Sequence, residues 1–144
     1  MSATAPGAGV AFPRVPVRLR LSRVRGFRLQ EVSRAANGLP ARAVTRPGPH
    51  GNPLAIGFRH GAWWVEEAAF TSELAARRRA TEGFAALVAD WPRARREALS
   101  EPLRGHNLAC ACPLPVPGEP DWCHARVWLD LCRTLVADAL PGAR

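Results

Sequence analysis

Residues 108–131, LACACPLPVPGEPDWCHARVWLDL, constrain the fold more strongly than any other part of the chain. The apolar run NLACAC predicts a short strand that stops at Cys112, because Pro113 lacks an N–H for pairing and holds its neighbour extended. The loop PLPVPGEPDW follows, and then a helix is predicted from about residue 124 to residue 140. That helix carries one apolar stripe and so one buried face, formed by Val127, Trp128, Leu131, Cys132, Leu135, Val136 and Ala139.

The rest of the chain shows shorter patterns of the same two kinds. In VPVRLRLSR, apolar residues alternate with Arg18 and Arg20, which predicts a half-buried strand that begins at a sheet edge beside Pro16. Two more strands and a hairpin turn are predicted at Arg42–Thr45, Leu54–Phe58 and Gly57–Gly61. Three helices are predicted: Glu66–Arg79, one that starts near Thr81, and one that starts at Pro92.

These elements predict a single small domain of the mixed α/β class, with a short sheet, packing helices and a closing strand–loop–helix unit. The domain is expected over residues 14–140. Residues 1–13 are small and rich in proline and glycine, so they are expected to form a disordered tail. A doubly wound parallel sheet is the alternative, but the chain has no glycine-rich fingerprint to support it.

The chain is strongly basic, because its 144 residues include 20 arginines and no lysine, with a formal net charge of +8. This charge would attract nucleic acid or phosphorylated ligands, although a solvated arginine surface gives the same count. Few aromatic residues lie among the arginines, so only weak, non-specific binding of nucleic acid is expected. No apolar run approaches the roughly 20 residues of a membrane helix. The start of the chain lacks a secretory pattern, and a cytoplasmic protein is therefore expected.

Three of the four cysteines lie in the closing segment. Cys110 and Cys112 are two residues apart in the expected strand and therefore share one face. Cys123 and His124 begin the buried side of the expected helix, at its N-terminus. If the loop between them folds back, the thiols and the imidazole meet at the carboxyl end of a strand, where α/β proteins often build sites. Cys132 lies within the apolar stripe and is expected to be a core thiol.

Three interpretations of this cluster remain open. Zinc is a candidate cofactor, and its candidate ligands are Cys110, Cys112, Cys123 and His124. Against zinc, Cys-x-Cys is a narrow spacing for a zinc pair, and adjacent Cys and His residues do not easily bind one ion. In the second interpretation Cys123 is a reactive thiol, because a helix N-terminus lowers a cysteine pKa and the neighbouring imidazole can act as a base. In the third, the small thiols only pack a tight strand–helix junction.

The segment LRGHNLACACPLPVPGEPDWCHARVWLDL resembles the closing motif of a bacterial and phage family catalogued as domain of unknown function 4326. The family pattern is Leu-x-Gly-x-x-Leu-x-Cys-x-Cys, a short loop, then Cys-His and a helix. RPGPHGNPL is similar to the family's Gly-Asn-Pro loop, carried here by Gly51, Asn52 and Pro53. RVRGFRL is similar to an arginine–glycine–aromatic segment that precedes that loop, so the resemblance covers about Arg23 to Leu140.

This chain departs from the family pattern at two places. Ala111 stands between the two strand cysteines, where the family usually has tryptophan. The loop between Cys112 and Cys123 and the region Glu66–Arg79 both look longer than usual, which suggests a lid or a surface insertion. The family's name assigns no activity, so the resemblance implies a site without a reaction and leaves open whether the chain is an enzyme.

The Gly-Asn-Pro loop is a candidate anion-binding loop. Gly51 and Asn52 belong to a tight turn that can expose backbone N–H groups. Arg46 precedes this turn, and Arg25 belongs to an earlier arginine cluster. Such loops suit phosphate, whereas a purely structural turn with solvent-facing arginines is the alternative. His50 is expected to be a loop histidine rather than a catalytic base.

The two segments together predict a pocket for a phosphorylated, nucleotide-like small ligand. Its expected ligand-binding residues are Arg25, Arg46, Gly51, Asn52, Cys110 and Cys112. In a catalytic role, Cys123 would be the nucleophile or a thiol in contact with the ligand, and His124 its base. The alternative function is a non-enzymatic module in which zinc staples the Cys/His segment and the arginines contact nucleic acid. The sequence predicts neither a reaction nor an oligomeric state.

Overall fold

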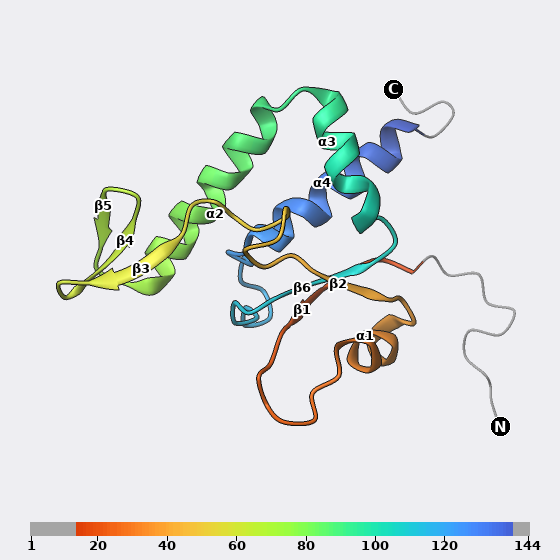
Figure 1. Ribbon diagram of the computed structural model, residues 1–144, viewed down its shortest axis with the longest axis horizontal. Coiled ribbons are helices and arrows are strands. Elements are labelled where there is room, and N and C mark those ends of the chain that lie inside the picture. Colours follow the sequence, from red (N-terminus) through yellow and green to blue (C-terminus); the bar gives the residue numbers. More distant parts are fainter. Residues whose placement is uncertain (1–13, 140–144) are drawn as a thin grey trace, which may run out of the picture.

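The computed structural model describes residues 14–139, so the predicted disordered tail and Leu140 lie outside the described residues. Two small sheets and four α-helices form a mixed α/β domain, as predicted (Figure 1). The elements are β1 Arg18–Arg20, α1 Leu29–Asn37, β2 Ala41–Ala43, β3 Ile56–Arg59, β4 Ala62–Val65, β5 Ala68–Phe70, α2 Glu73–Asp90, α3 Arg93–Ser100, the 3-10 turn Glu101–Leu103, β6 Asn107–Cys110 and α4 His124–Ala139. None of the described helices is long and apolar enough to cross a membrane.

The first sheet is parallel, with β6 paired between β1 and β2. All four residues of β6 are buried, as expected for a central strand with both faces covered. Leu108 and Cys110 belong to the core under α4, whereas Ala109 packs with residues on the α1 side. Figure 1 shows α1 and α4 on opposite sides of this sheet. The carboxyl ends of the three strands therefore lie at one edge, between α4 and the loop that follows β2.

The main core forms where α2, α3 and α4 meet above β6. Trp128 of α4 is fully buried and its ring lies against those of Phe84 and Trp91. The Trp128 indole N–H donates to the backbone carbonyl of His50, at 2.9 Å. The predicted closing helix is confirmed. Through Trp128, its apolar face also contacts the loop that follows β2.

The second sheet is an antiparallel meander of β3, β4 and β5 beside the first half of α2 (Figure 1). Strands β3 and β4 are joined at His60 and Gly61, which both have positive φ, at 52° and 75°. Two such residues make the tight hairpin turn whose twist matches that of the strands. The hairpin expected within Gly57–Gly61 is confirmed.

The prediction of one helix over Glu66–Arg79 and another from Thr81 is wrong. Glu66, with a φ of 55°, begins a turn into β5, and a single helix, α2, then runs from Glu73 to Asp90. The Ser72 hydroxyl caps this helix by accepting from the Ala75 N–H at 3.1 Å, so the true start lies later than the acidic pair suggested.

One helix and one strand end also differ from the sequence prediction. Helix α1 was not predicted, because its capping position, Arg28, makes no side-chain cap and Ser33 is its only buried residue. Strand β6 ends at Cys110, so the prediction that the strand extends to Cys112 is wrong. Cys112 lies beyond the last paired residue, in the turn that leads to Pro113.

Candidate functional site

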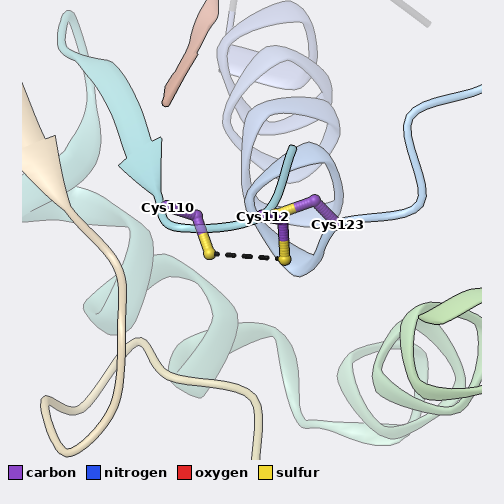
Figure 2. Close-up of side chains that lie close together, drawn as sticks. All are labelled: Cys110, Cys112 and Cys123. Atoms are coloured by element: carbon purple, nitrogen blue, oxygen red, sulfur yellow. Dashed lines mark hydrogen bonds between the residues drawn. The ribbon is translucent and has the colours of Figure 1, made fainter. Parts of the chain in front are cut away.

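Three cysteines meet where β6 ends and α4 begins. Cys110 is the last residue of β6, Cys112 follows in the next turn, and Cys123 immediately precedes α4. Figure 2 shows the three side chains gathered at this point. Their sulfur atoms all lie within 4.8 Å of one another, and the Sγ atoms of Cys110 and Cys112 are 3.8 Å apart. The expected folding back of the long loop therefore occurs, and all three thiols are free.

This cluster could hold a metal ion. In a tetrahedral zinc site with Zn–S bonds of about 2.3 Å, two sulfurs are separated by about 3.8 Å. The distance between Cys110 and Cys112 already has that value, and the remaining pairs fall within 4.8 Å. The narrow Cys-x-Cys spacing is therefore not an obstacle, because the chain turns sharply after Cys110 and brings Cys112 back beside it.

His124, the first residue of α4, lies against the cluster and is 7% exposed. Its Nε2 is 2.6 Å from the backbone carbonyl oxygen of Val44, just after β2. Its Nδ1 is 4.0 Å from the Sγ of Cys123. The edge of the Phe84 ring packs against the imidazole, with ring centroids 5.8 Å apart. The imidazole is thus held between the β2 backbone and the thiols.

A buried arginine holds the two ends of the long loop together. Arg18 donates to both carboxylate oxygens of Asp121, each at 2.8 Å. It also donates to the backbone carbonyls of Cys112 and Pro113, at 2.7 and 2.6 Å. The Arg18 side chain is only 4% exposed and that of Asp121 13%. This clamp fixes Cys112 on one side of the loop and Cys123, two residues after Asp121, on the other.

The sequence pattern misassigned Arg18 to the polar face of its strand. Period-two alternation separates buried from exposed residues only when one face of a sheet meets water. Here Leu19 packs on the α1 side, and Arg18 faces the long loop on the opposite side. Burial is the largest influence on its pKa and opposes the charged form, but the hydrogen bond to Asp121 and the electrostatic attraction of Asp121 and the nearby cysteines together raise the pKa.

The three thiols differ in acidity because they share hydrogen bonds. Hydrogen bonds from Cys112 and then Cys123 lower the pKa of Cys110 well below its ordinary value. The same contacts, first with Cys110, raise the pKa of Cys123 and of Cys112. Cys110 is therefore the most acidic thiol of the cluster. Burial raises the pKa of Cys132, which packs against the core as expected and lies outside the cluster.

A cavity of about 640 Å³ joins the cysteine cluster to the Gly-Asn-Pro loop. Its lining residues include all three cysteines, His124, Arg46 and Asn52. The two segments singled out in the sequence therefore contribute to one cavity. Arg25 does not line the cavity, whereas the neighbouring Arg23 does.

Helix α2 supplies a third wall that the sequence patterns did not indicate. Arg77 and Thr81 lie one helical turn apart and both line the cavity, together with the ring of Trp122. The Nε of Arg77 is buried and has no hydrogen-bond partner among the described residues. These residues were missed because the predicted break between two helices fell at this point, so no continuous helix face was expected here.

The Gly-Asn-Pro loop is docked onto α2 by tight packing. The Asn52 amide donates to the carbonyl of Ala80 at 3.0 Å and accepts from the Leu54 N–H at 2.9 Å. Both the oxygen and the nitrogen of the Asn52 amide therefore bond within the protein and hold the loop in place. A Cβ on Gly51 would lie 2.4 Å from the Arg46 Cγ, so only glycine allows this arginine to approach. His50 is a structural loop residue, since its Nε2 lies 2.7 Å from the Leu99 carbonyl oxygen.

The cavity geometry revises the expected order of thiol reactivity. Cys123 is 1% exposed and its pKa is raised, whereas Cys112 is partly exposed. In metal-free protein at neutral pH, we expect iodoacetamide to modify Cys112 at least about tenfold faster than Cys123, because the reagent must reach the sulfur and Cys112 is the more exposed of the two. Mass spectrometry of the quenched protein measures the alkylation of each cysteine. Labelling of the urea-unfolded protein gives the reference rate of each cysteine in the absence of tertiary structure. Faster native labelling of Cys123 would restore it as the reactive nucleophile.

A model of the family described as Domain of unknown function (DUF4326) matches residues 28–134. That span includes β2, the Gly-Asn-Pro loop, all of α2, the cysteine cluster and most of α4. No curated protein and no solved structure gives a significant match.

Proposed function

The chain belongs to the family described as Domain of unknown function (DUF4326), and we propose that this member binds a phosphorylated, nucleotide-like ligand in a zinc-bearing pocket. One observation carries the proposal. A single cavity has three thiols and three arginines, Arg23, Arg46 and Arg77, in its wall, and none of its described lining residues is acidic. Such a wall favours an anion at one end and a thiophilic metal at the other.

The arginines support a phosphorylated ligand. Guanidinium groups present planar pairs of N–H donors that match phosphate oxygens, and they stay charged at every physiological pH. A buried Arg77 Nε without a partner is costly unless a ligand accepts from it. Arg23 and Arg46 are exposed at the mouth of the cavity, where they would attract the ligand and then contact it.

The size and the aromatic wall support a nucleotide-like shape. A volume of about 640 Å³ lies within the range of small-ligand pockets. The indole of Trp122 lines the cavity, and the guanidinium of Arg78 lies 5.2 Å from the centre of its ring. A flat aromatic surface of this kind stacks with a base.

Zinc is the metal that best suits the cluster. Soft thiolate ligands select zinc over magnesium or calcium, which prefer oxygen. Bound there, zinc would cross-link β6, the following turn and the start of α4. Cys123 would then be a zinc ligand instead of a nucleophile. The alternative, a free Cys123 with His124 as its base, requires that the protein carry no metal.

The ligand proposal is tested with inorganic phosphate and AMP as probes, titrated by calorimetry. We expect AMP to bind more tightly than phosphate. We expect Arg46→Gln and Arg77→Gln each to weaken binding about tenfold to a hundredfold, as hydrogen bonds to charged groups contribute roughly 1.5–3 kcal/mol. The matched control is Arg34→Gln, which removes the same charge from the exposed side of α1, outside the cavity.

Two outcomes would contradict the ligand proposal. The first is an equal loss of affinity in the Arg34 variant, which would show that only net charge matters. The second is tight binding of duplex DNA with a steep salt dependence, together with no binding of AMP. That result would favour the zinc-stapled module that contacts nucleic acid.

A further inference from the structure

We propose that His124 completes the metal centre as its fourth ligand, through Nδ1, and that the Val44 carbonyl holds the ring in the state required. This inference rests on the zinc site of the proposed function and assigns its coordination as three thiolates and one imidazole.

The hydrogen bond to Val44 decides which ring nitrogen carries the proton. A backbone carbonyl oxygen can only accept, so the Nε2 of His124 at 2.6 Å must donate an N–H to it. In the neutral imidazole the proton-free nitrogen is then Nδ1, and its lone pair is available for a metal. Histidine ligands typically donate their other ring N–H to a carbonyl or carboxylate in this way.

The proton-free nitrogen faces the cluster. Nδ1 lies 4.0 Å from the Sγ of Cys123. Around one tetrahedral zinc, a nitrogen and a sulfur ligand are separated by about 3.6 Å. His124 lies outside the group of atoms that share the 4.8 Å limit, so its Nδ1 must approach the other sulfurs when the metal binds.

The adjacency of Cys123 and His124 does not prevent shared ligation. Successive residues within a helix point about 100° apart, and this spacing suggested that the pair could not bind one ion. Cys123, however, lies at a bend just before α4, while His124 is the first helical residue. The helical spacing therefore does not apply to this pair, and the Sγ of Cys123 and the Nδ1 of His124 are 4.0 Å apart. Phe84 packs edge-on against the imidazole and limits its rotation.

The test reads the ring directly. Long-range ¹H–¹⁵N NMR separates the two nitrogens of each histidine and shows which one is protonated or bound to metal. In zinc-loaded protein we expect one histidine with a protonated Nε2 and a metal-shifted Nδ1. That signal should disappear in His124→Gln and remain in the matched control His106→Gln, whose ring bonds the Arg104 carbonyl instead. Chelation should remove the metal shift from Nδ1 and leave the proton on Nε2.

Zinc affinity, measured by competition with a chromophoric chelator, gives a second readout. His124→Gln keeps an amide donor near the Nε2 position but offers no ligand at Nδ1, so the fold should persist while affinity falls at least about tenfold. If wild-type protein holds stoichiometric zinc but the His124 Nδ1 signal is unshifted, the fourth-ligand inference fails and the zinc site stands. If the protein holds no zinc at all, the zinc part of the proposed function fails, and this inference fails with it.

Discussion

Protein purified without added metal is expected to contain about one equivalent of zinc, and removal of that zinc should lower the unfolding free energy by at least about 5 kcal/mol. For a chain of this length, such a loss corresponds to a fall in Tm of about 10–20 °C. The cause is that metal binding and folding share the same free energy when the ligands come from distant segments. Cys110 and Cys123 are separated by a long proline-rich loop and meet only in the folded chain.

Elemental analysis and thermal unfolding with and without chelator measure this effect. Cys110→Ser and Cys112→Ser should reproduce the chelator result in the absence of chelator. Cys132→Ser is the matched control, because Cys132 packs against the core outside the cluster. Equal loss of zinc from the Cys132 variant, or wild-type protein without zinc and with unchanged stability in chelator, would show that the cluster is only a packing feature.

Arg18→Ala is expected to destabilise the protein by about 3–5 kcal/mol, because it leaves the Asp121 carboxylate buried without its partner. It also leaves the carbonyls of Cys112 and Pro113 without a donor. Arg18→Lys should recover only part of this loss. An ammonium group keeps the charge but cannot bond both carboxylate oxygens in parallel and reach two carbonyls.

Urea denaturation of the single and double variants measures the clamp. The Arg18→Ala and Asp121→Ala losses should be strongly non-additive, since each variant removes the same pair of bonds. Arg20→Ala on the same strand is the control, because Arg20 is exposed and should change stability by less than about 0.5 kcal/mol. Additive losses at Arg18 and Asp121, or an equal loss at Arg20, would contradict the clamp. Because the clamp sets the position of Cys112 and Cys123, Arg18→Ala should also weaken zinc binding.

An element of this chain was predictable from the sequence where its own residues determine its structure. Helix α4 carries its own apolar stripe, which predicts both the helix and its buried face. The hairpin between β3 and β4 needs only residues that accept positive φ, and His60 and Gly61 supply them. The resemblance to the family was also readable, because its motifs are short runs, and the family match confirms it.

The prediction failed at other elements because packing and strand pairing outweighed the local preference of the segment. Glu66 and Glu67 resemble the acidic start of a helix, yet pairing of Ala68 and Ala69 with β4 holds the segment as a strand. Helix α1 lacks a side-chain cap and a wide apolar stripe, so it depends on its packing against the sheet and on the left-handed turn at Gly38, whose φ is 82°. The contacts that hold α1 are with residues distant in sequence, such as Ala109, whereas β5 is held by the strand immediately before it.

The sequence alone determined that three cysteines and a histidine flank one loop, at the end of a strand and the start of a helix. Only the tertiary structure decided that they meet. Parallel pairing of β1 and β2 with β6 places Val44 beside the carboxyl end of β6, and the side chain of Arg18 reaches the turn that follows Cys110, although these residues are far apart along the chain. The same packing brings Arg77 of α2 into a shared cavity with Arg46. Spacing along the chain carries no information about which strand pairs with which, because that choice depends on the free energy of burying all their faces together.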